Sequence, residues 1–401
     1  MAPDGLVGLE ILPGNPDFLD LPWQLPMARW REASKRIVEV PRGISRHEVL
    51  FLQYDRRLYA AKELPPEVGE REYEALRWLE QRELPAVHAA GHARVRREGE
   101  ETSLLFTRFL EHSIPFRTLF ENARLEQYRP QLLDAIAGLL VRLHLAGFFW
   151  GDCSLSNTLF KRDAGQLQAY LVDAETAEMH GELSTGQRLH DLDILQENVA
   201  GDLLDVAAML GDRREETLDR TPGEIRSRYE RLWSEVTREE WVSPSESWRI
   251  HERIKSLNAL GFTVGEVKLE AVGDGNRLRM RTIVTDRDYH RDLLHDLTGI
   301  NAEDHQAKVM VQEIQEMQAT MARAENRSVP LAVAAYRWLT ERYQPTVRRL
   351  GGKGDPPELY CELLENKWYL SECAGRDVGM EVALEDYLKR FAPEVKPART
   401  E

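Results

Sequence analysis

The fold is decided by the stretch Phe149-Trp-Gly-Asp-Cys-Ser-Leu-Ser-Asn-Thr-Leu-Phe160, which is followed by Tyr170-Leu-Val-Asp-Ala-Glu175. Asp152 and Asn157 share one polar loop, and Asp173 ends a strand that can pair with the strand after Asn157. Phosphoryl transfer needs positioned metal ions and a carboxylate that orients the incoming hydroxyl. Asn157 and Asp173 offer the hard oxygen ligands that Mg²⁺ prefers, and Asp152 can accept the hydroxyl proton. These three side chains therefore predict a phosphoryl-transfer site.

The segments on either side of this loop predict regular structure. Residues 130–146 predict a helix, because Pro130 suits a first turn and Gly147 suits a helix end. After the loop, Thr158–Phe160 and Ala169–Val172 predict a hairpin, and residues 188–210 predict a second amphipathic helix. The first helix has apolar residues at the i, i+3, i+4, i+7 spacing of a buried stripe, namely Leu132, Leu133, Ile136, Leu139, Leu140 and Leu143.

This arrangement resembles the protein-kinase-like superfamily, whose catalytic loop reads Asp-x-x-x-x-Asn and is followed by a metal-binding Asp. The resemblance implies that Asp152 is the catalytic residue and that Asn157 and Asp173 are the metal ligands. It also implies ATP and Mg²⁺ as cofactors and an α+β, bilobal fold with a small β-rich N-lobe and a helical C-lobe.

The superfamily has an upstream Lys–Glu pair, and the chain offers both residues. Tyr59-Ala-Ala-Lys62-Glu resembles the strand that presents the ATP-contacting lysine, which implies that Lys62 contacts the α- and β-phosphates. The segment Arg71–Leu79 resembles the helix whose glutamate pairs with that lysine. Glu72 matches that position, with Glu74 as the alternative.

The phosphate loop and the adenine hinge of the superfamily also have counterparts. The turn Arg42-Gly-Ile-Ser-Arg-His47 lies where the glycine-rich loop belongs, so Gly43, Arg46 and His47 are expected to bind nucleotide. It contains a single glycine, and Arg42, Arg46 or His47 can compensate with side-chain donors. Phe106–Glu111 falls at the hinge that holds adenine.

Several positions depart from the protein-kinase pattern. Trp150-Gly151 replaces the usual His-Arg or His-Gly before the catalytic Asp, Ser154 replaces the catalytic-loop lysine, and no Ala-Pro-Glu motif follows Asp173. The Asp-Phe-Gly position reads Asp173-Ala-Glu175, where Glu175 is either a third metal ligand or an unrelated surface charge. These departures point away from a typical protein Ser/Thr kinase.

The wider sequence resembles a bacterial, lipopolysaccharide-kinase-like family that joins this core to a C-terminal domain of unknown function. The pieces that carry this resemblance are Leu21-Pro-Trp, Arg42–His47, Trp368-Tyr-Leu-Ser-Glu and Ala374-Gly-Arg-Asp-Val-Gly379. The family implies a kinase fold and a kinase activity, and it leaves the acceptor substrate open.

Composition limits the partners. The 53 Lys and Arg residues against 68 Asp and Glu residues give a net charge of −15, whereas binding to nucleic acid or to an anionic membrane requires a basic face. The three cysteines, Cys153, Cys361 and Cys373, are too widely spaced for a zinc ribbon or a disulfide framework. The N-terminus lacks signal-peptide features and no apolar stretch reaches the length of a membrane span, so we expect a cytoplasmic protein.

The 401 residues divide by pattern into two domains and an arm. Residues 1–37 predict a Pro-rich, aromatic arm whose Trp23 and Trp30 pack on the next domain. Residues 38–211 are the kinase-like core, with an N-lobe over 38–110 and a C-lobe over 111–211. Residues 212–401 predict a mainly helical domain with a β-hairpin at 267–284.

The sequence predicts an ATP- and Mg²⁺-dependent kinase acting on a hydroxyl of a sugar, a glycan or a protein. Two alternatives remain. One is a nucleotide-binding pseudokinase or scaffold that binds a partner through residues 212–401, and the other is an AMP transferase on the same fold. The oligomeric state is open, and Cys153 is either a redox-sensitive thiol or a small packed residue.

Overall fold

The computed structural model divides into two compact units of mixed helix and sheet. Unit 1 comprises Met1–Lys161 and Leu167–Arg238, and unit 2 comprises Arg162–Gln166 and Glu239–Glu401. The expected phosphate loop with Gly43, Arg46 and His47 lies outside the described residues. The residues that the structure describes are 5–40, 48–121, 129–210, 220–243, 246–259, 264–271, 278–284, 289–351 and 354–391.

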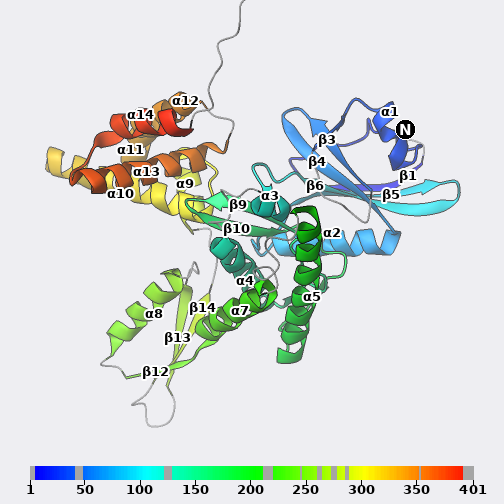
Figure 1. Cartoon of the computed structure of the whole chain (residues 1–401), viewed down its shortest axis with the longest axis horizontal. Coiled ribbons are helices and arrows are strands. Elements are labelled where there is room, and N and C mark those ends of the chain that lie inside the picture. The colour runs from blue at the N-terminus through cyan, green and yellow to red at the C-terminus, as the bar shows by residue number, and fades with distance from the viewer. Residues whose placement is uncertain are drawn as a thin grey trace, which may run out of the picture. The chain divides into compact units, whose positions relative to one another are not determined.

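Unit 1 begins with a six-stranded antiparallel sheet in the order β1-β5-β6-β4-β3-β2. Helix α2 (Pro66–Glu80), with Pro66 in its first turn, packs against strands β4, β5 and β6 (Figure 1). Lys62 sits in β4, where it pairs with Val49 of β3 and Leu105 of β6. The strands are β1 (Leu6–Ile11), β2 (Ile37–Val38), β3 (Val49–Tyr54), β4 (Arg57–Leu64), β5 (Ala89–Arg97) and β6 (Glu100–Arg108).

The N-terminal residues differ from the irregular arm that the sequence predicts, because β1 is an edge strand paired with β5. Trp23 and Trp30 are fully buried, as expected, in the cluster that contains Tyr59 and Ala61. Successive side chains of a strand point to opposite faces. The N-terminal aromatics therefore cover the face of Tyr59 and Ala61, and Lys62 points to the other face, where α2 lies.

The rest of unit 1 is mainly helical and carries the loop with Asp152. The predicted stripe of α4 is buried, and α4 packs against α7 and β8. Gly147 ends this helix at φ +86°, and a Cβ there would lie 2.3 Å from the carbonyl oxygen of His180, so the turn requires glycine. The elements are β7 (Ile114–Pro115), α3 (Phe116–Glu121), α4 (Arg129–Leu145), β8 (Phe148–Phe149), β9 (Thr158–Asp163), β10 (Gln166–Leu171), β11 (Glu178–Met179), α5 (Thr185–Leu210) and α7 (Thr221–Thr237).

Unit 2 contains a three-stranded sheet in the order β12-β14-β13 and a set of helices. The predicted hairpin is present as β13 and β14, and its expected turn at 273–276 lies outside the described residues. The elements are β12 (Glu240–Val242), α8 (Ser247–Ala259), β13 (Val264–Ala271), β14 (Leu278–Val284), α9 (Tyr289–Thr298), α10 (Asp304–Glu325), α11 (Leu331–Trp338), a π-helical turn (Leu339–Tyr343), α12 (Gln344–Leu350), α13 (Pro356–Ala374) and α14 (Gly379–Phe391).

The apolar stripe of α10 forms the core of unit 2. Met310, Ile314, Met317 and Met321 are buried in one cluster with Trp338 and Tyr360, so the methionines fill the interior of the unit. Among the helices of the described residues, none is both long enough and apolar enough to cross a bilayer.

Candidate active site

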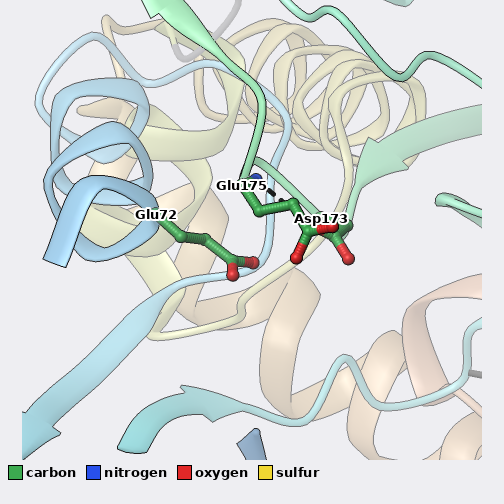
Figure 2. A group of neighbouring side chains, drawn as sticks. All are labelled: Glu72, Asp173 and Glu175. Atoms are coloured by element: carbon green, nitrogen blue, oxygen red, sulfur yellow. Dashed lines mark hydrogen bonds between the residues drawn. The ribbon is translucent and has the colours of Figure 1, made fainter. Parts of the chain in front are cut away.

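Lys62 lies at the centre of a group of carboxylates in unit 1. Its Nζ is 3.1 Å from Glu72 Oε2, 2.6 Å from Asp173 Oδ2 and 3.3 Å from Glu175 Oε2. Figure 2 shows Glu72 reaching from its helix toward Asp173 and Glu175, which share one loop after β10. The structure thus brings together the strand lysine and the helix glutamate that the sequence predicts, and it adds Glu175 to the pair.

Burial and charge shift the pKa values of this group. Burial raises the pKa of Glu72, the charge of Asp173 raises it further, and Lys62 opposes both effects without cancelling them. Burial acts to lower the pKa of Lys62, but the charges of Glu72, Asp173 and Glu175 outweigh it and the pKa is raised. Lys62 therefore keeps its positive charge at neutral pH.

Carboxylate oxygens from Glu72, Asp173 and Glu175 lie within 4.8 Å of one another. Such oxygens are the hard ligands that Mg²⁺ and Ca²⁺ prefer, and they suit soft metals poorly. The donor set therefore fits the magnesium ion that a kinase would need, with Glu175 as an oxygen donor that the Asp-Phe-Gly pattern lacks.

Asp152 and Asn157 meet within the loop between β8 and β9. The Asn157 side chain donates Nδ2 to the backbone oxygen and to Oδ2 of Asp152, both at 3.0 Å. Since the amide nitrogen is used in this way, Oδ1 is the atom that Asn157 can present to a cation. Val172 donates its N–H to the Asn157 carbonyl oxygen at 3.1 Å, so the residue before Asp173 is paired with Asn157.

Asn198 of α5 also holds the loop, although the sequence reasoning did not select it. Its Nδ2 donates to Asp152 Oδ1 at 2.9 Å and to the Cys153 carbonyl oxygen at 3.2 Å. Asp152 thus accepts one amide hydrogen bond on each carboxylate oxygen, from Asn157 and from Asn198. Its orientation is set from both sides.

Asp191 of α5 holds the backbone just before Asp152. Its fully buried carboxylate accepts the N–H groups of Trp150 and Gly151, both at 2.9 Å. Because a carboxylate only accepts, His144 donates Nε2 to Asp191 at 3.0 Å, and its Nδ1 accepts from the Tyr229 hydroxyl at 2.7 Å. Burial lowers the pKa of His144, which agrees with this neutral tautomer.

A weak signal for these residues exists in the sequence. Asp191 and Asn198 are polar residues on α5 beside the buried Leu192, Leu195 and Val199. A polar residue on the apolar side of a helix needs a hydrogen-bond partner, and here the partner is the loop.

Cys153 is a packed residue of the same loop. Its thiol is fully buried and donates to the Asp191 carbonyl oxygen at 3.0 Å. Burial, followed by the charge of Asp191, raises the pKa of the Cys153 thiol well above its usual value. A reactive thiol needs exposure and a lowered pKa, so the packed alternative is the one that the structure supports.

The expected adenine hinge, Phe106–Glu111, begins inside β6 and extends past the end of that strand. The side chain of Phe106 is buried and stacks on Phe18 at 4.4 Å between ring centroids, so that ring belongs to the core. Phe109 donates its N–H to the Leu58 carbonyl oxygen at 2.9 Å, and the strand ends at Arg108.

Comparisons with known proteins cover both parts of the chain. Residues 49–213 match the model of the lipopolysaccharide kinase (Kdo/WaaP) family, and residues 231–392 match DUF4032, a domain of unknown function. No curated protein matches the chain.

One matching solved structure, "WaaP in complex with acyl carrier protein", shares 17% sequence identity at a TM-score of 0.34. The match covers 57% of this chain and 90% of that chain. By these two family models, the core of this chain is similar to the lipopolysaccharide kinase (Kdo/WaaP) family and its C-terminal part is similar to DUF4032.

Proposed function

We propose that the protein is an ATP- and Mg²⁺-dependent phosphotransferase that acts on a hydroxyl acceptor. The observation that carries the proposal is the contact of Lys62 with both Glu72 and Asp173, in the same unit as the hydrogen-bonded pair Asp152 and Asn157. The sheet with α2 would form one lobe of a protein-kinase-like fold, and the helices around α4 and α5 would form the other.

Each residue has a role in this proposal. Asp152 orients the acceptor hydroxyl and takes its proton, and Lys62, positioned by Glu72, contacts the α- and β-phosphates. Asn157 and Asp173 would hold Mg²⁺, with Glu175 within reach. The bound ion would supply charge neutralisation for the phosphate oxygens. Because this chemistry uses ATP, the proposal places the protein in the cytoplasm.

The acceptor is proposed at the level of its chemistry. The family name names lipopolysaccharide, and a hydroxyl of a sugar or glycan is the acceptor that this relation favours. The protein carries a net charge of −15, so electrostatic attraction to an anionic surface does not help such a substrate to approach. The acceptors to be tested therefore include a soluble glycan and a protein as well as a lipid-linked glycan.

The test is ATP turnover with Mg²⁺ by wild type and Asp152→Asn, with a panel of glycan and protein acceptors. Loss of the proton acceptor is expected to lower kcat about 10²- to 10⁴-fold. Asp193→Asn is the matched control, because Asp193 is an exposed α5 residue that pairs with Arg226. The mass added to the acceptor distinguishes a phosphoryl group from an adenylyl group. Equal turnover by wild type and Asp152→Asn would reject the proposed catalytic role.

A pseudokinase is the second candidate, and the contact between Glu175 and Lys62 favours it. Glu175 stands at the position of the Asp-Phe-Gly glycine and lies 3.3 Å from the ammonium that a phosphate would contact. Thermal shift separates the two candidates. Equal stabilisation by ATP in EDTA and in Mg²⁺ favours the pseudokinase, whereas a magnesium-dependent increase favours the enzyme.

A further inference from the structure

The hairpin β9–β10 joins the two expected metal ligands directly. Strand β9 starts immediately after Asn157, and β10 ends two residues before Asp173. At the base of the hairpin, the Val172 N–H donates to the Asn157 carbonyl oxygen at 3.1 Å. The pairing and twist of this hairpin therefore set the separation between the backbones of Asn157 and Asp173.

The turn of this hairpin has an unfavourable backbone. Ala164 has φ +50° and Gly165 has φ +81°, the positive pair that a two-residue type I′ turn requires. A left-handed alanine costs about 1–2 kcal/mol. Within unit 2, Glu358 of α13 compensates part of this cost, because its Oε2 accepts the Ala164 N–H at 2.8 Å.

Asp163 at the tip is bound to the start of α10, again within unit 2. Its carboxylate accepts the N–H of His305 at 3.2 Å and of Gln306 at 2.9 Å, and only 1% of the residue is exposed. The first N–H groups of a helix have no partner within the helix, and a carboxylate there also interacts favourably with the helix dipole. Asp163 is therefore held to one position on α10.

Gln306 of α10 connects the tip to a second helix. Its fully buried amide donates Nε2 to the Arg162 carbonyl oxygen at 3.0 Å and to Glu358 Oε2 at 2.8 Å. Arg162 also pairs with Glu362 of α13. A buried amide that loses such partners leaves polar groups unsatisfied, and this penalty makes the arrangement specific.

We propose that the DUF4032 domain positions the metal ligands Asn157 and Asp173 by clamping the tip of the hairpin that joins them. Two-stranded hairpins are marginally stable alone, and within the described part of the chain β9 gains only the two-residue strand β7 as a further neighbour. Asp163 and Gln306 are the positioning residues of this clamp. The proposal rests on the proposed function in so far as Asn157 and Asp173 are taken as the metal ligands.

The test uses the full chain with Gln306→Ala and a matched control, Gln312→Ala. Gln312 lies on the same helix, exposed, and hydrogen-bonds to Glu316. The measurements are Mn²⁺ affinity in the presence of ATP, ATP affinity in EDTA, and amide exchange of residues 158–171. Gln306→Ala is expected to weaken Mn²⁺ binding about 10- to 100-fold, as losses of outer partners of metal ligands do. In Gln306→Ala, amide exchange in the hairpin should become faster, while ATP affinity in EDTA stays at the wild-type value. Gln312→Ala should match wild type in all three measurements.

A second variant keeps the test decisive if Gln306→Ala fails to fold by circular dichroism. Asp163→Asn preserves the size of the side chain and weakens its hydrogen bonds to α10, so the same pattern is expected. If the folded variants bind Mn²⁺ as tightly as wild type and exchange their hairpin amides at the wild-type rate, the proposed clamp is wrong.

The clamp and the proposed function fail in different ways. A wild-type protein that binds Mn²⁺ and ATP without transferring phosphate rejects the proposed activity, and the clamp is then judged on Mn²⁺ affinity and exchange. A wild-type protein that binds neither Mn²⁺ nor ATP rejects both.

Discussion

The ammonium of Lys62 shares one small volume with three carboxylates, those of Glu72, Asp173 and Glu175. Three carboxyl groups thus face one ammonium group, and a triphosphate would bring further negative charge to the same place. Coulomb repulsion at such distances is appreciable even in a high dielectric. Under the proposed function, the cluster would therefore favour a nucleotide that arrives with a divalent cation over the free nucleotide.

Replacing Glu175 should reveal this balance. Glu175→Gln removes one negative charge beside Lys62, so ATP binding in EDTA is expected to strengthen by about 1 kcal/mol, which is about fivefold in Kd. Isothermal titration calorimetry in EDTA measures the Kd for ATP of wild type and Glu175→Gln. Glu178→Gln is the matched control, because Glu178 is an exposed carboxylate of the same segment. Unchanged or weaker binding of ATP by Glu175→Gln would contradict this electrostatic interpretation.

Asn198 should affect catalysis more than stability. Asn198→Ala removes the amide that holds Asp152 Oδ1, and a displaced catalytic group can cost about 10²-fold in rate. The expected result is a lower kcat with the KM for ATP retained, and a loss of about 1 kcal/mol in the free energy of unfolding. The neighbouring Glu197→Ala, on an exposed position of α5, should match wild type in both. A normal kcat in Asn198→Ala would exclude the positioning role.

Three helices hold the loop that carries Asp152 through one buried chain of hydrogen bonds. His144 comes from α4, Asp191 from α5 and Tyr229 from α7, and all three are nearly inaccessible to solvent. Arg188 of α5 lies over the Trp233 ring of α7 at 3.9 Å and donates to the Tyr229 hydroxyl at 3.3 Å. Burial raises the pKa of Tyr229 to about 12, so its hydroxyl stays protonated and able to donate to His144.

This network predicts a pH dependence of stability. Burial lowers the pKa of His144 in the folded state; Asp191 opposes this shift, and Arg188 reinforces it. The unfolded chain, with a His pKa of about 6.5, then binds more protons below that pH than the folded chain does. The contribution of the neutral His144 to the free energy of unfolding is therefore fully present above about pH 6.5, and it is lost as the pH decreases.

Denaturant unfolding of wild type and His144→Gln at neutral and mildly acidic pH measures this effect. Wild type should lose more free energy of unfolding on acidification than His144→Gln, because the variant has no imidazole to protonate at this position. Comparing the two losses removes the constant cost of the substitution and the contributions of the other histidines. Equal losses would contradict the assignment.

The helices and hairpins could be predicted because their signal is local. The stripe of α4, the amphipathic pattern of α5 and the run from Met310 to Met321 of α10 all show helical periodicity in the sequence, and the structure contains these helices. Strand β1 was not predicted. Leu6–Ile11 contains Gly8, and its strand conformation depends on pairing with β5, which lies far away in the chain.

The whole chain is acidic, whereas the proposed nucleotide site is local. The net charge of −15 belongs to the molecule, whereas the proposed phosphate binding would depend on Lys62 and on the cation that the carboxylates would hold. Long-range attraction of polyanions needs a basic face, so the two properties are compatible.

The net charge predicts that duplex DNA is not bound. Fluorescence anisotropy with labelled DNA at about 0.15 M salt should show no saturable change, since nonspecific affinity derives from phosphate contacts by Lys and Arg. A basic DNA-binding protein in the same assay is the positive control. Saturable binding that weakens steeply with salt would reveal a basic surface that the overall charge conceals.

The residue types of the candidate site, their order and their flanking elements were all readable in the chain, because motif spacing and helical periodicity are local properties. The sequence did not show which of these residues contact one another. The contact of Glu175 with Lys62, the hold of Asn198 and Asp191 on the catalytic loop, and the binding of the β9–β10 tip by Gln306 and Glu358 join residues far apart in sequence. Such contacts arise when packing buries polar groups that must then find partners, and packing is a property of the folded chain.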